Sequence, residues 1–204
     1  MSKQPDDGAR EAIRLVDLSH PITPDMPVWP GTRGPELTPM ATLERDGYVE
    51  QVISLSTHAG THIDAPAHLI DGGLTLDRFD VSRFFGQALL VDATSVAGSI
   101  GRELFAGHRA ELQEIGFLLI RTGWDRFWGM PEYNQGFPVF DAHTARWLSD
   151  LPLKGIGLDC PSFDSASSHD YPLHQCLLGS GILLIENLTN LHLLPGSGFF
   201  ISVM

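Results

Sequence analysis

Glycine and proline interrupt this chain every ten to fifteen residues along its whole length. Both residues tend to end regular structure, glycine because its backbone turns freely and proline because it lacks an amide hydrogen. The apolar runs between them are correspondingly short, as in QALLVDAT and GILLIENL. This spacing predicts one domain built from many short elements joined by turns.

Six segments are predicted to be strands, because apolar and β-branched side chains either alternate in them or form short runs that end at turn residues. They span residues 14–22, 48–58, 87–94, 115–123, 181–188 and 198–204. Helical spacing predicts helices over residues 101–116 and 141–151, the second beginning at Asp141 as its N-cap. Strands outnumber helices and the two are interspersed, so we expect an α/β fold with a mixed sheet.

The length of 204 residues suits a single domain spanning 1–204, and we expect the first twelve residues to form a flexible tail. The chain contains no run of eighteen apolar residues and its N-terminus has no basic segment followed by an apolar one. These features predict a cytoplasmic protein without a membrane partner. Cys160 and Cys176 form no metal-binding or disulfide pattern, and both are interpreted as small buried residues.

The formal net charge of −12 argues against a nucleic-acid partner. The thirteen lysines and arginines are spread singly and form no basic stripe that could neutralise a phosphate backbone.

The segment STHAGTHIDAPAHLID, residues 56–71, concentrates three histidines and two aspartates. His58, His62, Asp64 and His68 fall on even positions, so their side chains would share one face of an extended chain. In a straight strand His58 and His62 would lie about 13 Å apart. We therefore expect a bend at Gly60, whose backbone permits one.

Two interpretations of this cluster are open. A lone histidine is usually an ordinary polar residue bonded to a neighbouring carbonyl. Three histidines beside an aspartate within eleven residues indicate instead a divalent metal site, and the mixture of imidazole and carboxylate suits Zn, Mn or Fe(II).

HAGTHIDAPAH fits the pattern HxGTHxDxPxH at every fixed position, and it resembles the metal-dependent cyclase or arylformamidase family, which includes kynurenine formamidase and isatin hydrolase. The resemblance extends to DLSHPITPDMPVWPGT, LLIRTGW, GIGLDCPSFDS and LHQCLLGSGILLIENLTNLHLLP, and so covers most of the chain. It implies a swivelling β/β/α fold and assembly as a homodimer or homotetramer.

The resemblance also implies roles for individual residues. His58, His62 and Asp64 would bind a first Zn or Mn ion, while Asp64, His174 and Glu186 would hold a second or complete the shell. His68 would be the catalytic acid and base, with a fourth metal ligand as the alternative. Neither His174 nor Glu186 could be chosen from spacing alone.

Trp29, in PVWPG, matches a position that lines the substrate pocket in the formamidase branch of that family. Its indole would stack on an aryl substrate, whereas the alternative is a hydrophobic turn. Trp124, Phe127 and Trp128 form a second aromatic group that either lines a pocket or anchors a loop. The expected partner is a small aromatic amide or cyclic amide.

These residues predict an enzyme that hydrolyses non-peptide carbon–nitrogen bonds with metal-activated water. A divalent ion lowers the pKa of bound water to roughly 7, and a histidine with a pKa near 6.5 can take and return the proton. The alternative is a non-catalytic metal-binding member that acts as a binding or structural module. The chain ends at GFFISVM, where members of the family generally continue into another strand, and we expect either a truncation or a different pocket rim.

Overall fold

The computed structural model describes residues 13–204. A six-stranded sheet forms its centre, in the order β10-β4-β6-β8-β9-β3. Its strands are β3 (His62–Asp64), β4 (Phe85–Asp92), β6 (Phe117–Arg121), β8 (Gly155–Leu158), β9 (Leu183–Glu186) and β10 (Phe199–Ser202). The inner four strands are parallel, whereas β10 and β3 pair antiparallel at the two edges. The predicted α/β class with a mixed sheet is confirmed.

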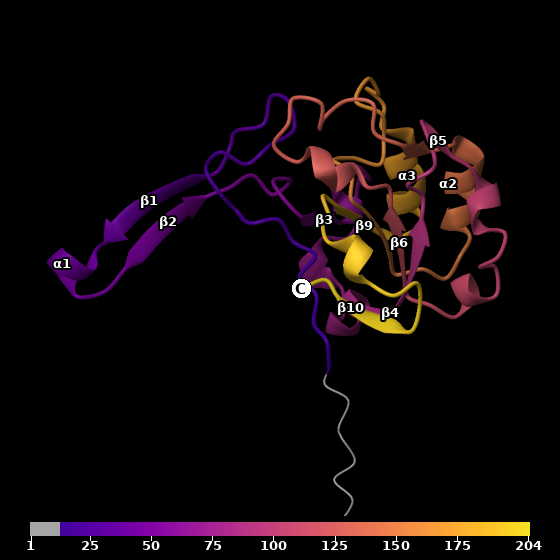
Figure 1. Ribbon diagram of the computed structural model, residues 1–204, viewed down its shortest axis with the longest axis horizontal. Coiled ribbons are helices and arrows are strands. Elements are labelled where there is room, and N and C mark those ends of the chain that lie inside the picture. Colours follow the sequence, from indigo (N-terminus) through magenta and orange to yellow (C-terminus); the bar gives the residue numbers. More distant parts are fainter. Residues whose placement is uncertain (1–12) are drawn as a thin grey trace, which may run out of the picture.

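The remaining elements lie around this sheet. They are β1 (Glu36–Ala41), α1 (Leu43–Asp46), β2 (Glu50–Ser54), β5 (Ser99–Ile100), β7 (Val139–Phe140), α2 (Ala142–Ser149) and α3 (Pro172–Gly179). Figure 1 shows α2 and α3 side by side against the sheet, and the β1–β2 hairpin projecting away from the rest of the molecule. No helix of residues 13–204 is long and apolar enough to cross a membrane.

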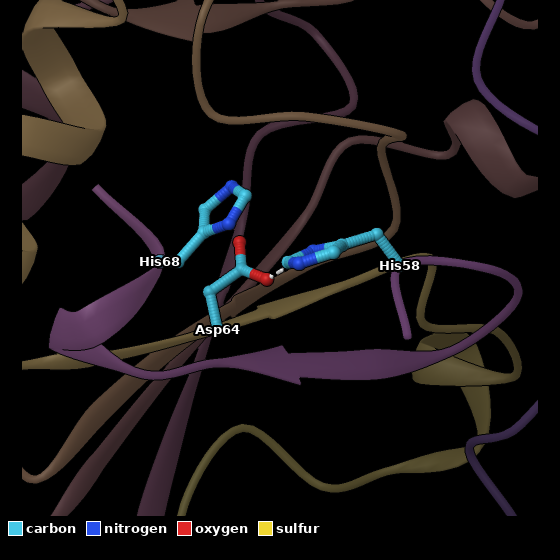
Figure 2. A group of neighbouring side chains, drawn as sticks. All are labelled: His58, Asp64 and His68. Carbon is cyan, nitrogen blue, oxygen red and sulfur yellow. Dashed lines mark ion pairs between the residues drawn. The ribbon is translucent and has the colours of Figure 1, made fainter. Parts of the chain in front are cut away.

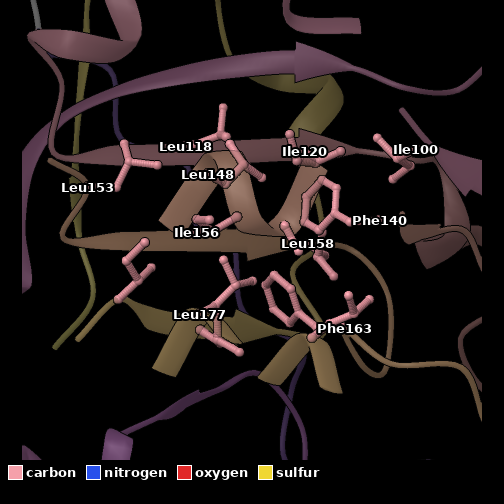
Figure 3. Close-up of a cluster of buried hydrophobic side chains, with 14 of the residues drawn as sticks. Ile100, Leu118, Ile120, Phe140, Leu148, Leu153, Ile156, Leu158, Phe163 and Leu177 are labelled. Atoms are coloured by element: carbon pink, nitrogen blue, oxygen red, sulfur yellow. The ribbon is translucent and has the colours of Figure 1, made fainter. Parts of the chain in front are cut away.

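Alternating side chains of the central strands pack into two hydrophobic cores, one on each face of the sheet. Leu118 and Ile120 point to the face covered by α2 and α3, where Figure 3 shows them packed with residues such as Phe140 and Leu177. Phe117 and Leu119 point to the opposite face. Because both faces are covered, β6 has no alternation of polar and apolar residues.

Glycines in β8 make room for this second core. A Cβ atom on Gly157 would lie 2.6 Å from Leu188 and 2.8 Å from Leu119, and one on Gly155 would lie 2.9 Å from the ring of Phe117. Real side chains do not tolerate such distances, so these positions require glycine for close packing.

Most of the predicted elements are present. β2, β6, β9 and β10 fall within predicted strands, β4 overlaps one and begins two residues earlier, and α2 falls within a predicted helix. The N-cap is also confirmed, since the carboxylate of Asp141 accepts a hydrogen bond from the amide of Thr144 at 2.6 Å.

Two predicted elements are wrong. The predicted helix over 101–116 is two separate 3-10 turns, Arg102–Phe105 and Glu111–Gln113, because Gly107 interrupts it and its apolar residues Phe105 and Leu112 reach the core from short turns. The predicted strand over 14–22 has no regular structure. Two of its amides donate to side chains instead of to a neighbouring strand, that of Ser19 to Asp17 and that of His20 to Thr61. The expected tail of residues 1–12 lies outside the described residues.

The cysteines differ from each other. Cys160 is fully buried two residues after β8, and this burial raises the pKa of its thiol well above the ordinary value. Cys176 is only half-buried, so the interpretation of both as buried residues is right for Cys160 alone.

Candidate metal centre

Two turns bring the predicted ligands between residues 58 and 68 together. Gly60 has a left-handed backbone (φ 69°), and the chain bends there between His58 and His62, as expected. β3 follows, and Pro66 then begins a 3-10 turn that carries His68 back toward the cluster. The bend and the turn let four side chains meet that a straight strand would keep apart.

Asp64 lies at the centre of the cluster. Its Oδ1 atom is 2.8 Å from Nδ1 of His58 and 3.4 Å from Nε2 of His62, and its Oδ2 atom is 3.6 Å from Nε2 of His174. Figure 2 shows the Asp64 carboxylate between the rings of His58 and His68. Every predicted metal ligand except Glu186 therefore lies within 4 Å of this one carboxylate.

Glu186 reaches the site through strand pairing. β3 pairs antiparallel with β9 in a register that places His62 directly opposite Glu186. Their side chains share one face, with His62 Nε2 3.4 Å from Glu186 Oε2, and His174 Nε2 lies 3.1 Å from Glu186 Oε1. The sheet thus joins residues that are more than one hundred positions apart in the sequence.

Two sets of three donor atoms have the spacing of a metal site. One set is His58, Asp64 and His68, and the other is His62, Asp64 and Glu186; within each set the donor atoms lie within 4.8 Å of one another. Asp64 belongs to both sets, so its two oxygens can serve one ion or bridge two.

The hydrogen-bonding state of these atoms fits a cation. Among the described residues, neither oxygen of Asp64 nor Nε2 of His62 makes a hydrogen bond of regular geometry, although Asp64 is only 1% exposed and His58 Nδ1 lies 2.8 Å from its Oδ1. Buried polar atoms are nearly always bonded, and an unpaired buried carboxylate is costly. Donors that face one another at short range without bonding are arranged for an ion between them, and the mixture of imidazole and carboxylate fits a divalent metal.

The charges of the site also favour a cation. Burial disfavours the charged form of His174, but the carboxylates of Asp164, Asp64 and Glu186 outweigh it and raise the pKa of His174 to about 11. Burial likewise opposes ionisation of Asp64, yet His174, His58 and His62 hold the pKa of Asp64 well below its usual range. A bound cation would take the place of the protons on these imidazoles.

Asp164 supports the cluster from outside, and the sequence did not reveal it. Its Oδ2 atom lies 2.7 Å from Nδ1 of His174, and its two oxygens accept the backbone amides of Leu173 and His174 at the start of α3, each at 3.0 Å. A carboxylate on Nδ1 fixes the ring so that Nε2 faces the site, as outer-shell carboxylates do for metal-bound histidines. The position follows β8 by a few residues, but nothing in its spacing to His174 marks it.

Replacing Asp164 with asparagine should lower metal affinity about ten- to a hundredfold, because the His174 ring loses the charge that orients it. The measurement is a competition titration against a chromophoric chelator. Asp170→Asn, the same change on an exposed residue of the same loop, is the matched control. Equal affinities for the wild type and Asp164→Asn would show that Asp164 only caps the helix.

A second supporting network orients His62. Nδ1 of His62 lies 2.8 Å from the carbonyl oxygen of Gly60, which also accepts a hydrogen bond from the side-chain amide of Asn187 at 2.8 Å. The Tyr133 hydroxyl donates to Asn187 Oδ1 at 2.8 Å, and the Thr61 hydroxyl donates to the Asn187 carbonyl. Because Nδ1 of His62 donates its hydrogen to the Gly60 carbonyl, Nε2 of the same ring keeps the free lone pair that a metal ligand requires. Neither Asn187 nor Tyr133 was predicted from the sequence.

Trp29 lies beside the cluster. It lines a small recess together with His58, Gly60, Tyr133 and Asn187. Its ring is half-buried and packs edge-on against Phe137, with 6.5 Å between the ring centroids. Trp29 therefore borders both the core and the metal centre.

The other aromatic group anchors a loop. Trp124 Nε1 donates to the carbonyl of Tyr133 at 2.8 Å, and Trp128 stacks on His20 with 3.8 Å between centroids. Neither indole lines the recess beside His58.

Comparison with known proteins agrees with this fold. Residues 16–165 match the model of the Cyclase family ("Putative cyclase"). Kynurenine formamidase of Salinibacter ruber is 31% identical over 90% of this chain and 86% of its own, and that of Erythrobacter litoralis is 29% identical over 86% and 79%.

Solved structures have the same fold. Isatin hydrolase A from Labrenzia aggregata, bound to benzyl benzoate, superimposes with a TM-score of 0.82 at 26% identity, covering 93% of this chain and 86% of that one. A predicted metal-dependent hydrolase from Bacillus stearothermophilus gives a TM-score of 0.74 at 28% identity, covering 92% and 87%. Fold and site together define a metal-dependent hydrolase. The chain belongs to the Cyclase family, as its histidine motif indicated.

Proposed function

We propose that this protein hydrolyses the carbon–nitrogen bond of a small aryl formamide or cyclic amide, using a divalent ion held by His58, His62, Asp64, His174 and Glu186. The observation that carries the proposal is the buried Asp64 carboxylate, which is surrounded by imidazoles and makes no hydrogen bond of regular geometry among the described residues. The kynurenine formamidase and isatin hydrolase relatives support the bond type, because their names refer to a formamide and to isatin.

We propose His68 as the acid-base group. A bound divalent ion supplies Lewis acidity, which makes water a nucleophile near neutral pH and polarises a carbonyl. His68 is exposed at the edge of the cluster, with its ring centroid 4.0 Å from that of His58. Desolvation and the neighbouring histidines lower its pKa, with Asp64 opposing. A neutral His68 can accept a proton from the attacking water and return it to the departing nitrogen.

Trp29 is proposed to hold the aromatic part of the substrate. Its indole faces the recess that also contains His58, so an aryl ring stacked there would bring its carbonyl close to the metal centre. Zn and Mn both suit the ligands, as one or two ions per chain. We further propose that the protein is cytoplasmic, because both of its cysteines are free thiols, as is usual in a reducing compartment. We also propose that it assembles as a homodimer or homotetramer.

The substrate proposal is tested with metal-loaded protein, N-formylkynurenine and isatin, followed by ultraviolet absorbance. One of the two should be turned over, which assigns the formamide or the lactam branch. Trp29→Ala should then raise KM roughly three- to tenfold, which corresponds to the loss of one aromatic contact. Trp29→Phe keeps an aromatic ring, so its KM should lie close to that of the wild type. The proposal fails if neither compound nor related lactams and imides react. An unchanged KM in Trp29→Ala would remove Trp29 from the pocket.

A further inference from the structure

Tyr171 has a backbone conformation that its side chain disfavours. The residue lies in the left-handed region, at φ 46° and ψ 52°, immediately before α3. A bulky residue is a genuine outlier there, because its Cβ atom crowds the following carbonyl oxygen. Among residues 13–204 only two other non-glycine residues have a positive φ, Asn187 and Asn190. Asparagine tolerates this conformation, so Tyr171 alone of the three carries the full steric penalty.

The next residue adds to the strain. Pro172 begins α3, and the ring of a proline restricts the preceding residue to extended conformations. The dipeptide Tyr-Pro therefore predicts an extended backbone at position 171, whereas the structure has a left-handed one. Strain of this kind persists only where surrounding contacts impose it, and it is concentrated at functional sites.

Hydrogen bonds on both sides impose the conformation. The two oxygens of Asp164 accept the backbone amides of the second and third residues of α3, each at 3.0 Å, which fixes the start of the helix. On the other side, the side-chain amide of Gln175 donates to the carbonyl oxygen of Asp170 at 2.8 Å. Tyr171 is thus held between two neighbours that are themselves fixed.

The Tyr171 ring packs against a predicted metal ligand. It meets the imidazole of His174 edge-on, with 6.0 Å between the ring centroids and 87° between the ring planes. The ring of His68 lies 6.2 Å from the same imidazole. Tyr171 and the proposed acid-base group therefore both border His174.

The hydroxyl of Tyr171 is a free hydrogen-bond donor. The buried hydroxyl of Tyr133 donates to Asn187, whereas that of Tyr171 has no hydrogen-bond partner among residues 13–204. Tyr171 is half-buried, so it remains partly accessible to solvent. A phenol donates well to an oxygen that carries negative charge. A free donor beside a metal ligand therefore suits an oxygen atom of the substrate.

We propose that Tyr171 is a further catalytic residue, whose hydroxyl donates a hydrogen bond to the carbonyl oxygen of the scissile amide. Attack of water on the carbonyl carbon moves charge onto that oxygen, so the hydrogen bond strengthens in the transition state. The backbone strain is the cost of placing the donor in advance. This inference rests on the proposed hydrolase function and adds a donor to the metal ligands and the acid-base group.

Tyr171→Phe removes only the hydroxyl. The assay uses metal-loaded protein and whichever of N-formylkynurenine and isatin the wild type turns over. We expect kcat to fall about ten- to a hundredfold, while KM and metal content stay close to the wild-type values. Tyr48→Phe, the same change on a residue of the β1–β2 hairpin that is 56% exposed, should leave kcat unchanged. An unchanged kcat in Tyr171→Phe, or loss of its metal, would overturn the proposal.

Thermal unfolding tests the strain without a substrate. Tyr171→Asn introduces the residue that the chain has at its other two non-glycine left-handed positions. Relief of the backbone penalty should offset the loss of the half-buried ring, so the Tm should equal or exceed that of the wild type. A Tm several degrees lower would mean that Tyr171 is retained for packing and would contradict the proposal.

The two proposals fail in different ways. A wild-type protein that turns over no amide contradicts the hydrolase function itself. An active wild type with an equally active Tyr171→Phe variant contradicts only the role of Tyr171.

Discussion

Replacing Asp64 with asparagine should abolish both metal binding and turnover. Asp64 is the only residue in both sets of donor atoms, and its two oxygens face His58, His62 and His174. An amide keeps the shape but removes the charge and one of the two acceptor oxygens. We expect metal affinity to fall by more than about a hundredfold, the upper end of what losing an outer-shell partner costs.

The measurement for Asp64→Asn is metal content after gel filtration, together with turnover at saturating metal. Asp71→Asn makes the same chemical change on an exposed residue shortly after the motif and should leave both unchanged. Retention of a full complement of metal by Asp64→Asn would mean that the buried carboxylate is not a ligand.

Replacing His68 with glutamine should reduce kcat by about 10²–10⁴-fold, the usual contribution of a general acid-base group, while metal content stays at the wild-type level. The reason is its position: His68 is the exposed histidine at the edge of the cluster, whereas His62 and His174 have buried rings held by Gly60 and Asp164.

The structure also places His68 among the donor atoms of one metal set, so the alternative role of a ligand has a distinct outcome. Loss of metal from His68→Gln, in parallel with turnover, would assign it to the metal shell. His143→Gln, on the exposed surface of α2, controls for the loss of an imidazole.

Local information was enough to predict part of this site. His58, His62, Asp64 and His68 lie within one segment, and Gly60 predicted the bend between His58 and His62. The turn that begins at Pro66 and brings His68 to the cluster became apparent from the structure. The metal chemistry followed from the residue types alone.

The rest of the site depends on tertiary contacts. His174 and Glu186 were inferred only from a family resemblance, because the register of β3 on β9 brings Glu186 to His62 and no local pattern encodes that register. Asp164, Asn187 and Tyr133 act through other side chains, and residues of these types are common in turns and cores. Their roles became apparent only when the hydrogen bonds were known.

The same distinction between local pattern and tertiary contact explains which elements of the fold could be predicted. Buried strands such as β6 and β9 were predicted because a short apolar run between turn residues has few alternatives. The helix predicted over 101–116 was wrong because the apolar residues of two short 3-10 turns have the same spacing as one face of an amphipathic helix. The segment 14–22 has strand-like composition, yet the amides of Ser19 and His20 donate to side chains and not to a strand.

The most direct test of the central claim is elemental analysis of protein purified without chelator, combined with turnover of N-formylkynurenine and isatin before and after metal removal. The account predicts one or two Zn or Mn ions per chain, loss of turnover with the metal, and recovery when the metal is returned. Bound metal without turnover of any amide would favour a non-catalytic binding module, and a chain that binds no metal would contradict the assignment of residues 58–68.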